Sequence, residues 1–149
     1  MNKKITNSLV WFRRDLRFED NHALYRALKS GSDVMPIFIY DSDITNKLNK
    51  NDHRLKYISE TIEKLNRKLE AKKKKIYTFS GKPINIIVDL IKKLNVKEIY
   101  LNKDYEPYAR ERDDEIKKKC ETNGVIFRSF KDHVIFEENE IVKKDGTPY

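Results

Sequence analysis

The 149-residue sequence is poor in cysteine and glycine, and each shortage excludes a class of protein. The single cysteine, Cys120, can form neither an internal disulfide nor a cysteine-based zinc site, so we predict a reducing, cytoplasmic location. Four glycines build no glycine-rich phosphate loop, and neither the dinucleotide-binding nor the P-loop motif occurs. No apolar run approaches the roughly 20 residues that span a bilayer, and the N-terminal segment lacks a secretory signal. We expect no membrane insertion and no export.

Patterns for catalysis and metal binding are also missing. The histidines, His22, His53 and His133, are far apart and form no H-E-x-x-H spacing, so we interpret each as structural or exposed. The adjacent acids Asp113 and Asp114 face different directions on a predicted helix. We therefore predict no metal site and no self-contained catalytic site.

Positive charge is concentrated in the first half of the chain. The net charge is +8, and residues 1–75 carry 18 basic against 10 acidic side chains. Four consecutive lysines at 72–75 lie between two predicted elements. A solvated loop is favoured over a nucleic-acid contact, because no aromatic residues interleave with the lysines to stack on bases.

Short apolar blocks alternate with longer amphipathic ones. Blocks rich in β-branched and aromatic residues predict five buried strands, at 9–12, 34–40, 76–79, 98–101 and 125–130. Four helical patterns lie between them. The clearest covers 54–71, where apolar residues recur at spacings of three and four, and the next, at 84–94, shows the same spacing. Asp20 or Asn21 can cap the first helix, Pro83 suits a first helical turn, and Gly31 and Gly124 suit helix ends.

This alternation predicts the fold class. Strands separated by helices pair in parallel through right-handed crossovers, so we expect a single α/β domain with a Rossmann-like, open five-stranded parallel sheet and helices on both faces. Ligands of such folds bind at the carboxyl ends of the strands. The polar segments 13–17 and 102–108 follow the first and fourth strands and are the candidate ligand-binding loops.

The stretch LVWFRRDLR at 9–17, followed by DNHAL at 20–24, resembles the opening signature of the DNA photolyase/cryptochrome family. The similarity continues through 37–41, Arg54, 81–83 and NKDYEPYARERD at 102–113. It reaches GTPY at 146–149, where the family's connector to its flavin domain begins. The resemblance implies an N-terminal antenna domain at 1–142, with 143–149 as the start of the connector and the helical FAD-binding domain beyond it.

The resemblance also implies a site for an antenna chromophore. Phe38 offers an apolar face to a planar ring, carboxylates accept hydrogen bonds from ring or ribityl donors, and Arg54 can meet a phosphate or carbonyl. A plainer interpretation makes Arg13 and Arg17 ion-pair partners that hold the first loop, and makes Tyr105 and Tyr108 packing residues with a solvated hydroxyl. The predicted cofactor-binding set is Arg14, Asp15, Phe38, Arg54, Asp104, Glu106 and Tyr108.

The identity of the pigment is narrowed by one departure from the family pattern. Tyr108 and Ala109 stand where the folate-binding branch has Asn-Glu, which favours 8-hydroxy-deazaflavin or FMN and keeps methenyltetrahydrofolate as an alternative. The resemblance places FAD in the absent domain and implies contact with damaged DNA only through the full-length protein. The chain alone is expected to bind its chromophore without catalysing repair.

Three other functions compete with a photolyase antenna domain. The same domain occurs in cryptochrome photoreceptors, which repair nothing. A nucleotide-binding α/β protein of the adenine-nucleotide hydrolase or electron-transfer-flavoprotein type would need a glycine-rich phosphate loop near the last strands, and Gly124 and Gly146 form no such cluster. A structural module would bind no small molecule at all.

Overall fold

The alternating apolar segments of the chain become alternating strands and helices. The computed structural model describes residues 7–137 and 140–147. In chain order the elements are β1 (Asn7–Phe12), α1 (His22–Lys29), β2 (Asp33–Asp41), α2 (Ser42–Thr45), α3 (His53–Leu69), the 3-10 helix η1 (Glu70–Lys72), β3 (Tyr77–Gly81), α4 (Pro83–Leu94), β4 (Val96–Asn102), α5 (Pro107–Thr122) and β5 (Ile126–Phe130).

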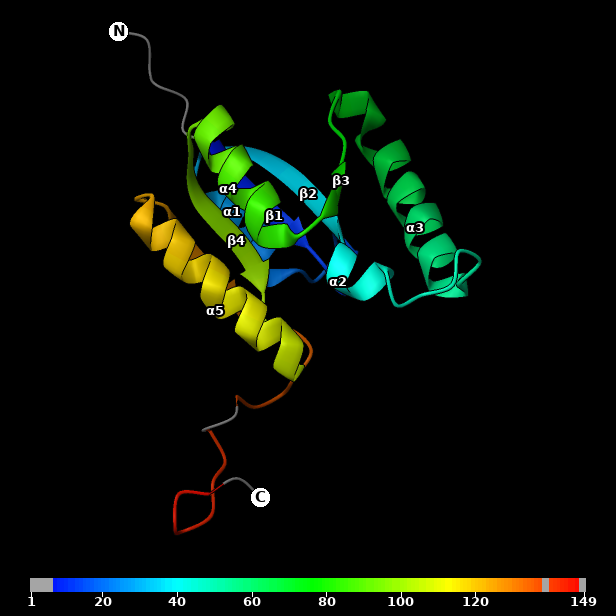
Figure 1. Ribbon diagram of the computed structural model, residues 1–149. Coiled ribbons are helices and arrows are strands. Elements are labelled where there is room, and N and C mark those ends of the chain that lie inside the picture. The colour runs from blue at the N-terminus through cyan, green and yellow to red at the C-terminus, as the bar shows by residue number, and fades with distance from the viewer. Residues whose placement is uncertain (1–6, 138–139, 148–149) are drawn as a thin grey trace, which may run out of the picture.

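The strands form one parallel sheet in the order β3-β2-β1-β4-β5. The chain winds outward from β1 to β3, then crosses back to β4 and continues to β5 on the other side. Helices cover both faces, with α4 and α5 on one side and α1 on the other, and α3 runs along the β3 edge (Figure 1). The predicted α/β class and five-stranded parallel sheet are confirmed.

Each face of the sheet has its own core. Alternate residues of a strand point to opposite faces, so Leu9 and Trp11 pack under α4 and α5 while Val10 and Phe12 pack toward α1 and α3. All four side chains are at most 1% exposed. Trp11 is therefore a core residue, as its position inside a strand predicts.

Two of the five strands are not buried, which corrects one prediction. β3 and β5 are the edge strands, and most of their residues are exposed or half-buried. The buried positions in these blocks are Ile76 and Val125, each just before its strand begins. An edge strand has one neighbour and incomplete helix cover, so its apolar composition alone does not bury it. The short helix α2 was not predicted.

The helix ends follow the predicted chemistry. Asn21 rather than Asp20 caps α1, because its side chain accepts a hydrogen bond from Leu24 N at 3.1 Å. Gly31 and Gly124 take the left-handed conformation after α1 and α5, with φ of 73° and 68°. Pro83 lies in the first turn of α4.

After β5 the chain leaves the sheet as an extended segment (Figure 1). Ile135 and Phe136 in this segment are 82% and 57% exposed, and a 2.7 Å hydrogen bond from Lys143 N to Thr147 O closes a turn near its end. The predicted boundary between domain and connector falls here. Residues 148–149 of that connector, and 1–6 and 138–139 of the predicted domain, lie outside the described residues.

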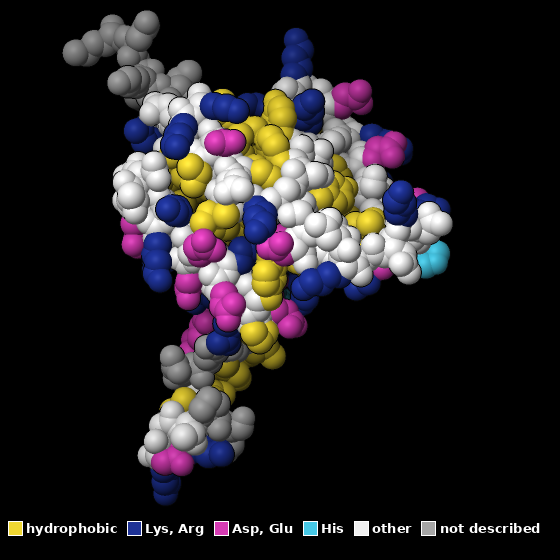
Figure 2. All heavy atoms as spheres, viewed as in Figure 1, with side chains coloured by type: hydrophobic (Ala, Val, Ile, Leu, Met, Phe, Trp, Pro, Cys, Tyr) yellow, Lys and Arg dark blue, Asp and Glu magenta, His cyan; other side chains and the backbone are white. Residues whose placement is uncertain are grey.

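Charged side chains of both signs are mixed on one face of the molecule (Figure 2). Figure 2 shows lysines and arginines interspersed with acidic side chains on the face that carries α4 and α5. The lysines at 72–75 are exposed, and Lys74 pairs with Asp33 at 2.9 Å. Among the described residues, no helix is long and apolar enough to cross a membrane.

Candidate ligand-binding site

A cavity of about 650 Å³ opens at the carboxyl ends of β1 and β2. Its walls come from the ends of these strands, from α2 and the first half of α3, and from the first turns of α5. Phe38 and Tyr40 point to one face of the sheet, whereas Trp11 and Ile39 point to the other. Because the cavity touches all four, it extends over the edge of the sheet from α3 to α5.

Six of the seven predicted site residues line this cavity, although they come from four separate parts of the chain. Phe38 belongs to the wall and is 6% exposed. Arg14 and Arg54 are at the rim, with side chains 66% and 71% exposed. The six are Arg14, Phe38, Arg54, Asp104, Glu106 and Tyr108. Contact of these residues with a chromophore stays a prediction.

Asp15, the seventh predicted residue, lies outside the cavity lining. It is 7% exposed, and its carboxylate accepts hydrogen bonds from Arg13 N at 2.8 Å and Asn102 Nδ2 at 2.7 Å. The Asn102 amide also donates to Asn21 Oδ1 at 2.9 Å, and its oxygen accepts from Ala23 N at 3.0 Å. Asp15 thus holds the loop after β1 against β4 and α1.

The same network fills the crevice where the strand order reverses. In doubly wound sheets this crevice, between β1 and β4 here, is the usual ligand position. Arg13 occupies it and donates to the carbonyl oxygen of Asn102, and the space left beside Asp15 is only about 10 Å³. The open cavity consequently lies one strand further along, over β1 and β2.

The inner wall of the cavity is supported by an ionic chain that the sequence did not reveal, in which Tyr108, Asp41, Arg112 and Arg13 line the cavity and Asp113 lies outside its lining. Tyr108 Oη donates to Asp41 Oδ2 at 2.8 Å, and Arg112 Nη1 donates to the same oxygen at 3.3 Å. Arg112 Nε reaches Asp113 Oδ1 at 3.2 Å, and Arg13 Nη1 contacts both oxygens of Asp113 at 2.6 and 2.5 Å. This chain ties β1, β2 and α5 together.

Two sequence signals point to these missed residues. Asp41 directly follows the apolar run of β2, in the same position relative to its strand as Asn102 relative to β4. Arg112 lies four residues after Tyr108, so the two side chains share one face of α5. The ion-pair interpretation of Arg13 and Arg17 matches the structure, in which Arg17 pairs with Asp132 at 2.5 Å.

Exposed ion pairs surround the mouth of the cavity. Arg14 lies 3.8 Å from Asp104 Oδ2 and 3.7 Å from Glu106 Oε1. Arg54 is held by Asp52, the N-cap of α3, through Nε and Nη2 at 2.9 and 2.8 Å. These hydrogen bonds from Arg54 lower the pKa of Asp52 to about 2. Arg14 and Arg54 are therefore both paired with carboxylates at the mouth, and an anionic ligand group would compete with these solvent-exposed pairs.

Burial and contacts with carboxylates also raise the pKa values of two tyrosines. Burial, followed by the hydrogen bond to Asp41, raises the pKa of Tyr108 well above its ordinary value. Burial and the neighbouring Glu137 raise the pKa of Tyr105 to about 12. Both phenols stay protonated at neutral pH and act as hydrogen-bond donors. Tyr105 is outside the cavity lining and packs edge-on against His133 at 5.2 Å.

The arrangement suits binding of a planar ligand: an apolar wall beside a cavity of about 650 Å³, fixed polar groups inside, and exposed, ion-paired cations at the mouth. No group of three or more His, Cys, Asp or Glu side chains within 7–137 and 140–147 is arranged to hold a metal ion. The fold and cavity define a doubly wound α/β ligand-binding domain. The chain belongs to the DNA photolyase family, whose model matches residues 8–149, and corresponds to the family's N-terminal α/β domain.

Similar proteins include both cryptochromes and a deoxyribodipyrimidine photo-lyase. Cryptochrome-1 of Aedes aegypti is 30% identical over 146 residues, covering 94% of this chain and 27% of that protein. Deoxyribodipyrimidine photo-lyase of a Synechococcus strain is 27% identical over 141 residues, covering 95% of this chain and 29% of that protein. The chain thus spans little more than a quarter of the length of these relatives.

Two solved photolyases share the fold. The archaeal photolyase of Sulfolobus tokodaii, described with two FAD molecules and an implied novel light-harvesting cofactor, superposes with a TM-score of 0.79 at 30% identity. The superposition covers 93% of this chain and 32% of the archaeal photolyase chain. The class III photolyase of Agrobacterium tumefaciens gives a TM-score of 0.83 at 28% identity over 98% of this chain and 30% of its own.

Proposed function

We propose that this chain is the light-harvesting domain of a deoxyribodipyrimidine photolyase and that the cavity over β1 and β2 binds its antenna chromophore. The observation that carries the proposal is a 650 Å³ cavity at the strand carboxyl ends of a photolyase-family domain. Sites for small molecules and cofactors span about 300–1,000 Å³, so the cavity is large enough for a fused tricyclic ring.

The cavity favours a planar pigment with a polar tail. Phe38, Leu55 and Ile58 supply apolar and aromatic surface for the ring, and Arg14 and Arg54 stand at the mouth where a tail would emerge. The preference for 8-hydroxy-deazaflavin or FMN over methenyltetrahydrofolate rests on Tyr108 and Ala109, which stand where the folate-binding branch of the family has Asn-Glu. The pigment would absorb light, and the protein would hold the pigment in a fixed orientation and shield its ring from water.

In the proposed full-length protein, excitation energy passes from this pigment through space to FAD in a C-terminal domain. FAD then drives the repair of pyrimidine dimers, and damaged DNA is contacted by the full-length protein alone. Residues 1–142 form the pigment-binding domain in this proposal, and 143–149 begin the connector. Support comes from the photo-lyase relative and from the archaeal photolyase with its implied light-harvesting cofactor.

A cryptochrome-type photoreceptor is the second candidate. The 30% identity to Aedes aegypti cryptochrome-1 supports it, and this candidate places the pigment in the same cavity. The two candidates differ in chemistry on DNA. Blue-light repair of a pyrimidine-dimer oligonucleotide by the full-length protein would select the photolyase, and light-induced flavin reduction without repair would select the photoreceptor.

The antenna proposal is tested by titrating the 149-residue chain with 8-hydroxy-deazaflavin, FMN and methenyltetrahydrofolate. Binding is followed by pigment fluorescence and absorption. We expect saturation at one pigment per chain for at least one of the three. The substitution Thr45→Trp adds an indole at a position in the wall of the cavity and should abolish this binding.

The matched control is Thr122→Trp. Thr122 is exposed in the last turn of α5, at the opposite end of the helix from the cavity. It should leave pigment affinity unchanged while adding the same side chain. The proposal fails if no pigment saturates the wild-type chain, or if binding survives Thr45→Trp unchanged.

A further inference from the structure

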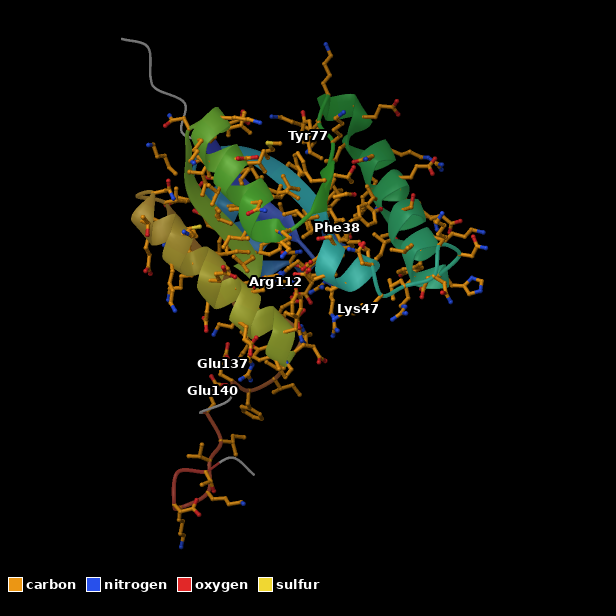
Figure 3. The ribbon with its side chains drawn as sticks, viewed as in Figure 1. Phe38, Lys47, Tyr77, Arg112, Glu137 and Glu140 are labelled. Atoms are coloured by element: carbon orange, nitrogen blue, oxygen red, sulfur yellow. The ribbon has the colours of Figure 1, made fainter. Side chains whose placement is uncertain are left out.

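A second pocket, of about 520 Å³, lies at the other end of the sheet from the cavity over β1 and β2. Its walls are the end of α1 and the first halves of β4 and β5. The amino ends of parallel strands meet at one edge of the sheet, so this pocket is at the opposite edge from the carboxyl ends beside α2, where Figure 3 labels Phe38 and Arg112. The two sites share no lining residue. A ligand of the second pocket would therefore leave the first one open.

The second pocket has an excess of positive charge. It is lined by four cations, Arg26, Lys29, Lys97 and Arg128, and by one carboxylate, Glu98. Arg128 Nη2 pairs with Glu98 Oε1 at 3.0 Å. Within the part of the chain that the structure describes, no carboxylate lies at ion-pair distance from the other three cations, and all three are exposed. Three positive charges can thus meet a ligand without breaking an existing ion pair.

Aromatic rings position the two arginines. The guanidinium carbon of Arg26 lies 5.8 Å from the centroid of the Phe130 ring, and that of Arg128 lies 5.9 Å from the centroid of the Tyr100 ring. The two rings are nearly parallel, at 10°, with centroids 6.2 Å apart. Contact with a ring face restrains a guanidinium and leaves its N–H donors free for an anion. Arg26 is therefore a positioned donor without a carboxylate partner.

Charge and size indicate the kind of ligand. Four cations against one carboxylate leave a net charge of +3, which suits a chain of phosphates better than a single one. A volume of about 520 Å³ lies within the range of small-molecule sites. Ile126, which is 50% exposed beside Gly124, offers apolar surface to a base. A compact ligand fills such a bounded pocket, whereas a nucleic-acid backbone tracks along an open groove.

We propose that this pocket binds a nucleoside triphosphate, with Arg26, Lys29 and Lys97 on the phosphates and Ile126 beside the base. The inference is independent of the proposed function, because the site lies at the other end of the sheet from the cavity over β1 and β2. A triphosphate bound here would connect α1 with β4. Because it binds only the folded chain, it should also raise the Tm of the wild-type domain.

The test is calorimetric titration of the 149-residue chain with ATP, inorganic triphosphate and adenosine at low salt. We expect ATP to saturate one site per chain, inorganic triphosphate to bind several-fold more weakly because it lacks a base, and adenosine not to bind measurably. The double substitution Arg26→Gln and Lys29→Gln should weaken ATP binding about tenfold, as expected for the loss of two exposed charged donors. Both positions are exposed, so the variant should keep the fold.

The matched control is the double substitution Lys92→Gln and Lys93→Gln. These lysines occupy the last turn of α4, as Arg26 and Lys29 occupy the last turn of α1, and they are exposed and outside the pocket lining. The control removes the same charge from the same place relative to a helix end, so it accounts for general electrostatic and helix-dipole effects. Thr45→Trp, which adds an indole to the cavity over β1 and β2, should leave ATP binding unchanged.

The inference is wrong if ATP does not saturate the wild-type chain, or if the two double variants weaken its binding equally, since binding would then follow overall charge. Loss of ATP binding in Thr45→Trp would locate ATP in the cavity over β1 and β2 and also overturn it. Inorganic triphosphate that binds as tightly as ATP would contradict recognition of a nucleoside. A DNA duplex that binds more tightly than ATP through Arg26 and Lys29 would show a nucleic-acid contact instead. The antenna proposal is judged separately, by the pigment titrations.

Discussion

The Tyr108 hydroxyl donates a 2.8 Å hydrogen bond to the Asp41 carboxylate and so joins the first turn of α5 to the end of β2. The same carboxylate caps α2 by accepting from Asp43 N at 3.0 Å, and it pairs with Arg112. One buried acid therefore positions three elements of the cavity wall. This dependence makes Asp41 and its partners the first residues to test for stability.

Removing the Tyr108 hydroxyl should destabilise the fold slightly. We expect Tyr108→Phe to lower the free energy of unfolding by about 0.5–1 kcal/mol, because the bond is charge-assisted but the tyrosine is 39% exposed. Urea denaturation followed by circular dichroism measures it. Tyr25→Phe, at a 58% exposed position on α1, should have no effect. Equal losses in the two variants would show that the Asp41 contact contributes nothing.

The stabilising effect of Tyr108 should depend on pH. Because the pKa of Tyr108 is raised in the folded state, the folded protein holds this proton more tightly than the unfolded chain, whose tyrosines titrate near pH 10. The contribution is complete below about pH 10 and declines as the pH rises toward the folded value. The stability difference between wild type and Tyr108→Phe should therefore be constant from about pH 7 to 9 and shrink above pH 10. A difference that grows above pH 10, in denaturation series at each pH, would contradict this sign.

The network around Asp15 should matter more for stability than for pigment contact. Asn102→Ala removes three buried hydrogen bonds. The Asn102 side chain donates to Asp15 and Asn21 and accepts from Ala23 N in the first turn of α1. We expect a loss of about 2–3 kcal/mol in the free energy of unfolding, because buried polar groups lose their partners. Asn85→Ala, exposed on α4, is the matched control for urea denaturation. A loss below about 0.5 kcal/mol would mean that this network does not hold the loop.

Cys120 should resist chemical modification in the folded protein. The side chain is 0% exposed, and burial raises the pKa of its thiol to about 11. We expect reaction with a thiol reagent at neutral pH to be on the order of a hundredfold slower than for free cysteine. In guanidinium chloride one thiol per chain should react at the free rate. Fast labelling of the native chain would show that the core between α5 and the sheet opens readily.

The rim arginine Arg14 should distinguish a phosphorylated ligand from its parent. If the tail of the pigment emerges beside Arg14, FMN should bind more tightly than riboflavin, and Arg14→Gln should reduce that preference by about two- to fivefold. Arg67→Gln, an equally exposed arginine on α3, is the control. Titrations at low and high salt measure the ratio of the riboflavin Kd to the FMN Kd for each variant. If Arg14→Gln leaves this ratio unchanged, Arg14 does not contact the ligand.

The sequence predicted the fold well because the fold depends on patterns of local origin. Strand composition, helical spacing and cap residues are local, and they predicted the five parallel strands and helix boundaries such as Pro83 and Gly124. Burial of the edge strands was predicted wrongly, since strand order depends on crossovers that no local pattern records. Helix α2 is four residues long, too short for a periodic signal.

The candidate site was likewise predicted in part from the sequence. The polar segments after β1 and β4 were found from strand position and family resemblance, and six of the seven residues named from the sequence lie around one cavity. Asp15 was named with them, but its carboxylate is engaged with Asn102 outside that cavity. The difference depends on where a side chain points after the chain folds, which composition does not determine.

By itself, the sequence determined the α/β fold, the polar loops at the strand ends and the family to which the chain belongs. Only the tertiary structure decided that Arg13 fills the crevice between β1 and β4, that the cavity lies over β1 and β2 instead, and that Arg112 joins Asp41 and Trp11 in its wall. The physical reason is distance along the chain. Asp41 and Arg112 are 71 residues apart, and their contact exists only because parallel crossovers bring the end of β2 and the start of α5 to the same edge of the sheet.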